Sequence, residues 1–134
     1  MMDLPTLGGR RAPLAVSMIL ALMLVACGGE APGVRTVSAA AAVAELGSRT
    51  VIDVRTPAEL GAGMITGALN IDFQAADFRD RVSALDRSGR YLLYCRTGNR
   101  SGQAAAIMRD LGFTDVIDAG GFAALAAAGA PTTP

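Results

Sequence analysis

From residue 34 onward, short strand-type runs alternate with helix-type patterns, and this alternation constrains the fold more than any other feature of the sequence. The run 50–54 is β-branched and apolar, as is typical of a central strand, whereas 75–85 carries apolar residues at helical spacing. The expected strands are 34–37, 50–54, 68–71, 90–94 and 115–117, and the expected helices are 39–46, a short segment from Pro57, 75–85, 101–111 and 122–128. Such alternation predicts an α/β fold in which helices cover both faces of a mostly parallel sheet.

The junction between the strand 90–94 and the helix 101–111 holds the residues best suited to chemistry. Its sequence is Cys95-Arg96-Thr97-Gly98-Asn99-Arg100-Ser101. The first amides of a helix lack intrahelical acceptors and favour negative charge, and loop amides add a concave anion site. Together with two arginines, these groups stabilise a thiolate, so Cys95 is predicted to be a nucleophile of low pKa. A lone cysteine after a strand is commonly a small buried hydrophobe, but packing alone would not require these neighbours.

Composition narrows the chemistry that this junction can support. The chain has 134 residues, which fits one domain, and twelve basic residues balance twelve acidic ones. A balanced charge provides no broad basic surface, so nucleic acid is not expected as a partner. All the basic residues are arginine and the chain has no histidine. A histidine general base is therefore excluded, and neither a metal site nor a cofactor is expected.

The N-terminal segment 1–26 is expected to be a signal peptide. Arg10 and Arg11 precede an apolar run, 12–26, that is too short for a comfortable membrane span. The run ends in Leu-Val-Ala-Cys, which resembles the lipobox of bacterial lipoproteins and implies cleavage before Cys27 and lipid attachment there. The alternatives are an ordinary secretory signal and, less favoured, a disulfide between Cys27 and Cys95. We therefore expect an exported chain, anchored through lipid to the bacterial cell envelope, with 27–33 as a flexible tether.

Several blocks of the sequence share the order and content of one family's motifs. They are the loop 95–101, Ile-Asp-Val-Arg-x-x-x-Glu within 51–60, Gly-x-Ile-x-Gly-Ala-x-Asn-Ile over 63–71, and Leu-Gly-Phe followed by Gly-Gly within 111–124. These blocks resemble the single-domain rhodaneses, the thiosulfate-type sulfurtransferases. The resemblance covers 34–130 and leaves 131–134 as a tail. It implies the rhodanese-like three-layer fold, with a central, mostly parallel sheet and helices on both faces.

The resemblance also implies a sulfur transfer in two steps. The Cys95 thiolate takes sulfur from a small anionic donor such as thiosulfate, and the resulting persulfide passes it to cyanide or a thiol. Cys95 is then the catalytic residue, and the expected substrate-binding residues are Arg96, Thr97, Gly98, Asn99, Arg100, Ser101 and Arg55. Gly98 permits a tight turn, and Arg96 is expected to project toward the donor. Asp53 and Glu59 are expected to support the site, each as a candidate ion-pair partner of Arg100. For Arg55, the alternative to substrate binding is a buried ion pair that holds the loop after the strand 50–54.

Two positions depart from the family pattern, and two other functions stay open. Met64 stands where the family usually has histidine and Leu125 where an aromatic residue is common, which predicts altered loop packing and a more open pocket. A rhodanese-like chain can also serve as a persulfide carrier or as a binding module without turnover. Cysteine-based phosphatases and arsenate reductases use a similar loop with five residues between cysteine and arginine, whereas four separate Cys95 from Arg100 here.

Overall fold

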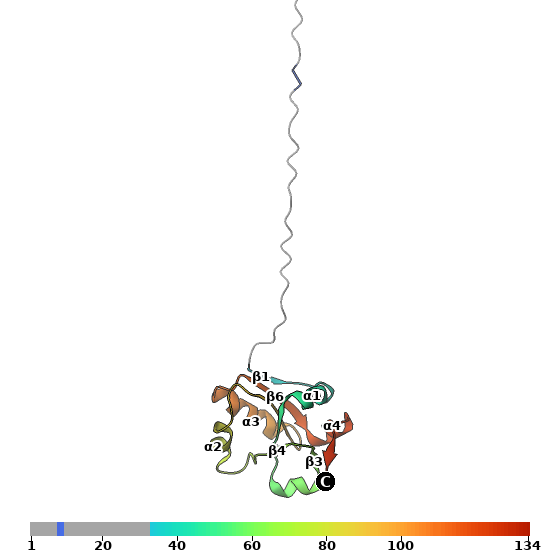
Figure 1. Ribbon diagram of the computed structural model, residues 1–134, viewed down its shortest axis with the longest axis vertical. Helices are drawn as coiled ribbons and strands as arrows, with labels where there is room; N and C mark the ends of the chain where they lie inside the picture. The colour runs from blue at the N-terminus through green and yellow to red at the C-terminus, as the bar shows by residue number, and fades with distance from the viewer. Residues whose placement is uncertain (1–7, 10–32) are drawn as a thin grey trace, which may run out of the picture.

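The computed structural model describes residues 8–9 and 33–134, so the expected signal peptide, the lipidation site at Cys27 and the tether up to residue 32 lie outside the described residues. Five strands form one parallel sheet in the order β1-β6-β5-β2-β4 (Figure 1). They are β1 Gly33–Thr36, β2 Thr50–Asp53, β4 Leu69–Asn70, β5 Arg90–Cys95 and β6 Asp115–Gly121. Because β5 lies in the middle of this order, its carboxyl end emerges at the centre of one sheet edge.

Helices cover both faces of this sheet. The helices α1 (Ala39–Glu45) and α4 (Phe122–Ala127) pack on one face, and α2 (Phe78–Ser83) and α3 (Asn99–Asp110) pack on the other. Two 3-10 helices, η1 (Leu46–Ser48) and η2 (Pro57–Ala62), follow α1 and β2. This arrangement confirms the predicted three-layer α/β fold. Among the described residues, no helix has both the length and the apolar character needed to cross a bilayer.

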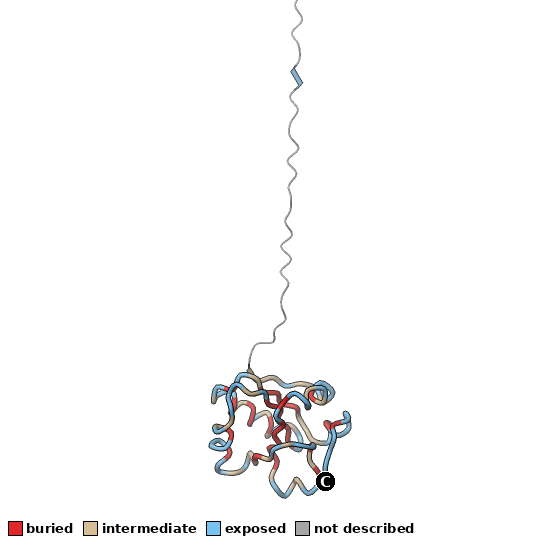
Figure 2. The backbone as a smooth tube through the Cα atoms, in the orientation of Figure 1, coloured by how far each residue is buried: buried red, intermediate tan, exposed pale blue. Residues whose placement is uncertain are grey.

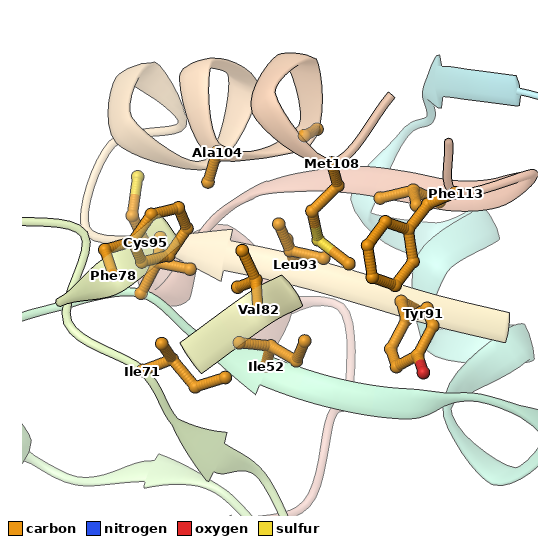
Figure 3. Packing of buried hydrophobic residues seen from close by; sticks show 13 residues of the cluster. Ile52, Ile71, Phe78, Val82, Tyr91, Leu93, Cys95, Ala104, Met108 and Phe113 are labelled. Atoms are coloured by element: carbon orange, nitrogen blue, oxygen red, sulfur yellow. The ribbon is translucent and has the colours of Figure 1, made fainter. Parts of the chain in front are cut away.

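The strands divide their side chains between two hydrophobic clusters, one on each face of the sheet. On β5, Tyr91 and Leu93 pack with α2 and α3, whereas Leu92 and Tyr94 pack with α1 and α4. Figure 2 shows the buried residues concentrated along the central strands, and Figure 3 shows the cluster beneath α3. Each fully buried large apolar side chain contributes about 2 kcal/mol to folding. The two clusters therefore hold β5, and the loop that follows it, in a fixed position.

Several element boundaries differ from the expected ones. The helix α3 begins at Asn99, before the predicted start at residue 101, because Gly98 completes the turn with a φ of 97°. The helix α2 covers only Phe78–Ser83, since the residues from 73 to 77 form turns that the apolar spacing does not reveal. The strand β6 runs on to Gly121, well past the predicted end at residue 117. Ser38 caps α1 as expected, accepting the Ala41 amide at 3.2 Å.

A second sheet of two short strands was not predicted. The strand β3 (Met64–Ile65) pairs in antiparallel fashion with β7 (Thr132–Thr133), and the Thr66 amide donates to the Pro131 carbonyl at 2.9 Å. The segment 131–134, predicted to be a tail, thus folds back against the domain through the pairing of β7 with β3. Strands of two residues show no periodicity, and glycine or proline flanks both, so no strand pattern is visible in the sequence.

Candidate active site

Cys95 is the last residue of β5, and the loop that follows it leads directly into α3. The residues from Tyr91 to Cys95 are all buried, so the core fixes the position of the sulfur. The pairing of β5 with β6 shifts between Leu93 and Cys95, which brings Cys95 opposite Gly121. In Figure 3 the Cys95 side chain lies on the α3 side of the sheet, near Phe78 and Ala104. The sulfur therefore lies next to the N-terminus of α3, as the sequence predicts.

Hydrogen bonds favour the ionised form of this sulfur. Burial of Cys95 opposes ionisation, but the Ser101 hydroxyl and the amides of Ser101, Gly98 and Thr97 outweigh it and lower the pKa of the thiol. The Gly98 amide donates to Sγ at 2.9 Å, and the Ser101 Oγ lies 3.6 Å from Sγ. Arg100 adds a charge interaction, since Cys95 is one of the groups that raise the pKa of its guanidinium. The loop thus provides an anion site of the kind expected for a nucleophilic cysteine.

Arg96 follows the last residue of β5 and, unlike the fully buried Cys95, it is exposed to solvent. Its exposed side chain borders a cavity of about 340 Å³. The residues lining this cavity are Arg55, Ala58, Glu59, Ala62, Arg96, Phe122 and Ala123. The cavity is thus lined by alanine and phenylalanine side chains together with Glu59 and two arginines, of which Arg96 is exposed and Arg55 is buried.

Arg55 forms an almost fully enclosed ion pair with Asp53. Its Nη2 donates to Asp53 Oδ2 at 2.6 Å and to the Gly63 carbonyl at 2.7 Å, and its Nε donates to both carboxylate oxygens. Burial works against the charged guanidinium, but the hydrogen bonds to Asp53 prevail and raise the pKa of Arg55. The guanidinium also lies 4.5 Å from the centre of the Phe122 ring. These contacts match the buried ion pair that is the alternative role of Arg55, and substrate binding by Arg55 stays a prediction.

Arg100 pairs with Glu59, which is one of the two partners considered from the sequence. The pair is bidentate, with Nη1 to Oε2 at 2.8 Å and Nη2 to Oε1 at 2.7 Å, and it ties the first turn of α3 to η2. Chiefly through Arg100, and further through Thr56, the pKa of Glu59 falls to about 2. Glu59 also accepts the Thr56 amide at 2.9 Å, which caps η2. Asp53 is occupied by Arg55, so each carboxylate supports one arginine.

The remaining predicted loop residues take different positions. Thr97 and Asn99 are exposed, and the Asn99 Oδ1 accepts from Gln103 Nε2 at 2.8 Å within α3. Ser101 is fully buried beneath the loop. Met64 lies in β3, where it pairs with β7. Leu125, expected to open the pocket, is fully buried in the core cluster beneath α1 and α4, and Phe122 borders the cavity instead.

Two features of the site were missed from the sequence. Asp118 accepts the Ser101 hydroxyl at 2.7 Å. Its position directly after the predicted strand 115–117 was the one sequence signal that could have placed it at the site. The pair Gly120 and Gly121 allows β6 to approach the loop, because a Cβ at Gly121 would lie 2.7 Å from the Arg96 carbonyl oxygen and a Cβ at Gly98 would lie 3.2 Å from the Gly120 Cα. Within the described residues, no cluster of three or more cysteine and acidic side chains could hold a metal ion.

Comparisons with known proteins agree with this architecture. Residues 36–128 match the family model of the rhodanese-like domain. The thiosulfate sulfurtransferase PspE of Escherichia coli is 36% identical over 70 residues, covering 52% of this chain and 67% of that protein. A sulfurtransferase of Allochromatium vinosum is 37% identical over 82 residues, covering 60% of this chain and 75% of the relative. The crystal structure of a rhodanese-related protein from Thermoplasma volcanium superposes with a TM-score of 0.66 at 32% identity, covering 74% and 97% of the two chains.

Proposed function

The chain belongs to the rhodanese-like domain family, and we propose that it is a sulfurtransferase in which Cys95 carries the transferred sulfur. The observation that supports this most directly is the environment of Cys95. Its sulfur accepts the Gly98 amide at 2.9 Å beside the first turn of α3, and its pKa is lowered by the loop although burial opposes ionisation. Relatives named as sulfurtransferases match the chain over 70 and 82 residues. A stabilised thiolate is the nucleophile that sulfur transfer needs.

The first step is the attack of the Cys95 thiolate on the outer sulfur of a donor such as thiosulfate. The sulfur–sulfur bond of the donor breaks, its electron pair leaves with sulfite, and Cys95 becomes a persulfide whose outer sulfur carries the negative charge. Loop amides stabilise this charge as they stabilise the thiolate. Arg96, exposed at the rim of the cavity, is placed to attract the anionic donor.

The second step returns the enzyme to its starting state. A thiolate or cyanide attacks the outer sulfur of the persulfide, the sulfur–sulfur bond to Cys95 breaks, and the Cys95 thiolate is regenerated. No proton transfer at Cys95 is needed in either step, which suits a chain without histidine. The cavity of about 340 Å³ that Arg96 borders is in the size range of small-molecule sites, and we propose it as the place where an acceptor larger than cyanide first binds.

Intact mass after exposure to thiosulfate tests the proposal. The full chain carrying Cys27→Ser is incubated with thiosulfate, freed of excess reagent and weighed by mass spectrometry. We expect a gain of one sulfur atom that cyanide removes and that is absent when Cys95→Ser is added. Repeated turnover with cyanide identifies an enzyme, whereas a single loading that no small acceptor discharges identifies a persulfide carrier. A folded, reduced protein that gains no sulfur contradicts both forms of the proposal and leaves a binding module.

Phosphoryl transfer is the less favoured chemistry for this loop. Phosphatases of this kind need an arginine that binds the phosphate, but Arg100 already donates to both carboxylate oxygens of Glu59. Hydrolysis of a phosphate ester by the same protein, lost in Cys95→Ser, would reverse this preference.

We further propose that the chain is exported and carries lipid on Cys27. The sequence Leu24-Val25-Ala26-Cys27 after an apolar run supports this proposal. Lipid chains on one residue would hold the domain at a membrane of the cell envelope. Mass analysis of the N-terminal peptide from native membranes provides the test. We expect a chain that starts at Cys27 with an added lipid mass, and an intact, unmodified N-terminus would contradict the proposal.

A further inference from the structure

Cys95, Ser101 and Asp118 form a short chain of polar contacts beneath the loop. The Ser101 Oγ lies 3.6 Å from the Cys95 sulfur and 2.7 Å from Asp118 Oδ1. Ser101 is fully buried and Asp118 is only 7% exposed, so water does not compete strongly for these contacts. Asp118 Oδ1 also accepts the Gly120 amide at 3.1 Å, which holds the carboxylate in place at the end of β6. The chain thus connects the reactive sulfur to a buried carboxylate on another strand.

The Ser101 hydroxyl has only one proton to donate. Its three neighbours that can accept are Asp118 Oδ1 at 2.7 Å, the Gly98 carbonyl at 3.1 Å and the Cys95 sulfur at 3.6 Å. When Cys95 is a neutral thiol, its S–H can donate to Ser101 while Ser101 donates to Asp118. When Cys95 is a thiolate, the sulfur becomes a strong acceptor and the same hydroxyl is needed to stabilise it. The carboxylate and the thiolate therefore make competing demands on one proton.

We propose that Asp118 is a positioning residue that acts on Cys95 through Ser101, by competing with the sulfur for the single hydroxyl proton of Ser101. In the thiolate state, Ser101 rotates to donate to the sulfur, and Asp118 keeps the Gly120 amide. In the thiol state, Ser101 donates to Asp118. No bond to sulfur forms or breaks in this exchange, since only the direction of one hydroxyl changes. Asp118 thereby raises the free energy of the thiolate and limits how strongly the loop ionises Cys95.

Other charged groups around Cys95 do not remove this competition. Arg100, on α3, interacts favourably with the Cys95 sulfur, but its guanidinium is paired with Glu59 on η2 and is influenced by Asp72. The exposed side chain of Arg96 borders the cavity lined by residues of η2 and α4, and Cys95 is not among the lining residues. Asp118 contacts Ser101 in α3, so its negative charge lies on the α3 side of the sheet, as does the Cys95 sulfur.

The competition has a consequence for the catalytic cycle, and this part rests on the proposed function. In a Cys95 persulfide the negative charge lies on the outer sulfur, so the inner sulfur no longer needs the Ser101 proton. Ser101 can then return to Asp118, an exchange that the free thiolate does not permit. Asp118 would thus favour the sulfur-loaded state over the empty thiolate.

The pH dependence of alkylation tests the proposal without requiring any sulfur transfer. The full chain reacts with iodoacetamide over a range of pH, and peptide mass spectrometry reads the modification at Cys95 separately from Cys27. We expect Asp118→Asn to lower the midpoint by roughly one pH unit or more, because a neutral amide competes less strongly for the hydroxyl and removes a nearby negative charge. Asp110→Asn, the same change at an exposed position far along α3, should leave the midpoint in place.

Ser101 shows whether Asp118 acts through it. Ser101→Ala should raise the midpoint, since the thiolate loses a donor, and the effect of Asp118→Asn should shrink to less than half in that background. A midpoint that rises or does not move in Asp118→Asn overturns the proposal, as does an unchanged effect of that substitution in the Ser101→Ala background. If alkylation supports it but thiosulfate adds no sulfur to the wild-type chain, only the proposed function fails.

A measurement on the wild-type chain covers the case in which Asp118→Asn does not fold. The carboxyl carbon of Asp118 can be followed by NMR as pH is raised. We expect its resonance to shift at the midpoint of Cys95 ionisation, when the Ser101 proton leaves the carboxylate. The shift should vanish in Cys95→Ser. A resonance that does not respond at that pH overturns the proposal.

Discussion

The Glu59–Arg100 pair should make the stability of the domain depend on acid. The pKa of Glu59 falls from 4.5 to about 2, first through Arg100. A drop of this size corresponds to roughly 3 kcal/mol as an upper bound. About a quarter of the Glu59 side chain and 18% of the Arg100 side chain remain exposed, so solvent screening reduces the expected contribution to about 1–2 kcal/mol. The pair joins η2 to the first turn of α3, so its loss should weaken the attachment of the loop 95–101 to η2.

Glu59→Gln isolates the charge, because a glutamine oxygen can still accept the Thr56 amide. Urea unfolding should show a loss of about 1–2 kcal/mol at neutral pH, or a melting temperature lower by about 4–8 °C for each kcal/mol. Because the folded state holds the Glu59 carboxyl at a lower pKa than the unfolded state, this stabilisation is complete above about pH 4.5 and disappears as pH falls through about 2. The difference between wild type and variant should therefore narrow in acid.

The control for this prediction is a double-mutant cycle with Arg100→Gln. In that background, Glu59→Gln should cost less than about 0.5 kcal/mol, since no guanidinium remains to pair with. A cost at neutral pH that persists unchanged in acid, or that is the same without Arg100, would show that the glutamate stabilises the fold by some means other than this ion pair.

Two further substitutions separate the binding of the donor from the geometry of the loop. Arg96→Ala should raise the KM for thiosulfate by about 10- to 100-fold, as expected for a lost charged contact. It should leave urea unfolding unchanged, because the Arg96 side chain is exposed. A variant with a normal KM would show that Arg96 does not bind the donor. Gly121→Ala should abolish sulfur loading, because the new Cβ would lie 2.7 Å from the Arg96 carbonyl oxygen and force the loop to move. The control Gly47→Ala has open space around the new Cβ and should load sulfur normally. Equal loading of the two variants would show that the loop tolerates displacement.

The layers of the fold could be predicted because the apolar pattern encodes them. Residues 51–54 and 91–94 are all buried, as is typical of central parallel strands, and α2 between them buries Phe78 and Val82 at helical spacing. The strands β3 and β7 could not be predicted, because each is two residues long and is specified by pairing with the other. Their formation depends on contacts between segments far apart in the chain, which local sequence patterns do not express.

The sequence predicted which residues form the candidate site, but it did not predict which side chains form ion pairs and hydrogen bonds with one another. The loop 95–101 could be placed after β5 from sequence alone, and Cys95 lies where the pattern predicts. The sequence left the partner of Arg100 open between Asp53 and Glu59, because one carboxylate lies at the end of β2 and the other soon after it. The choice depends on Arg55, whose guanidinium stays with Asp53 and leaves Glu59 to Arg100. Asp118 was missed because its role depends on the register between β6 and the first turn of α3.

The parallel sheet also sets the orientation of the site relative to the point where the chain enters the domain. Gly33 opens β1 at the edge of the sheet where the strands begin, whereas Cys95 lies at the edge where they end. At about 3.3 Å for each residue of a strand, β5 alone separates these edges by roughly 20 Å. A domain held by the residues before Gly33 would therefore present its reactive loop on the far side from its attachment. Under the proposed function, the donor and the acceptor would reach that side without crossing the attachment point.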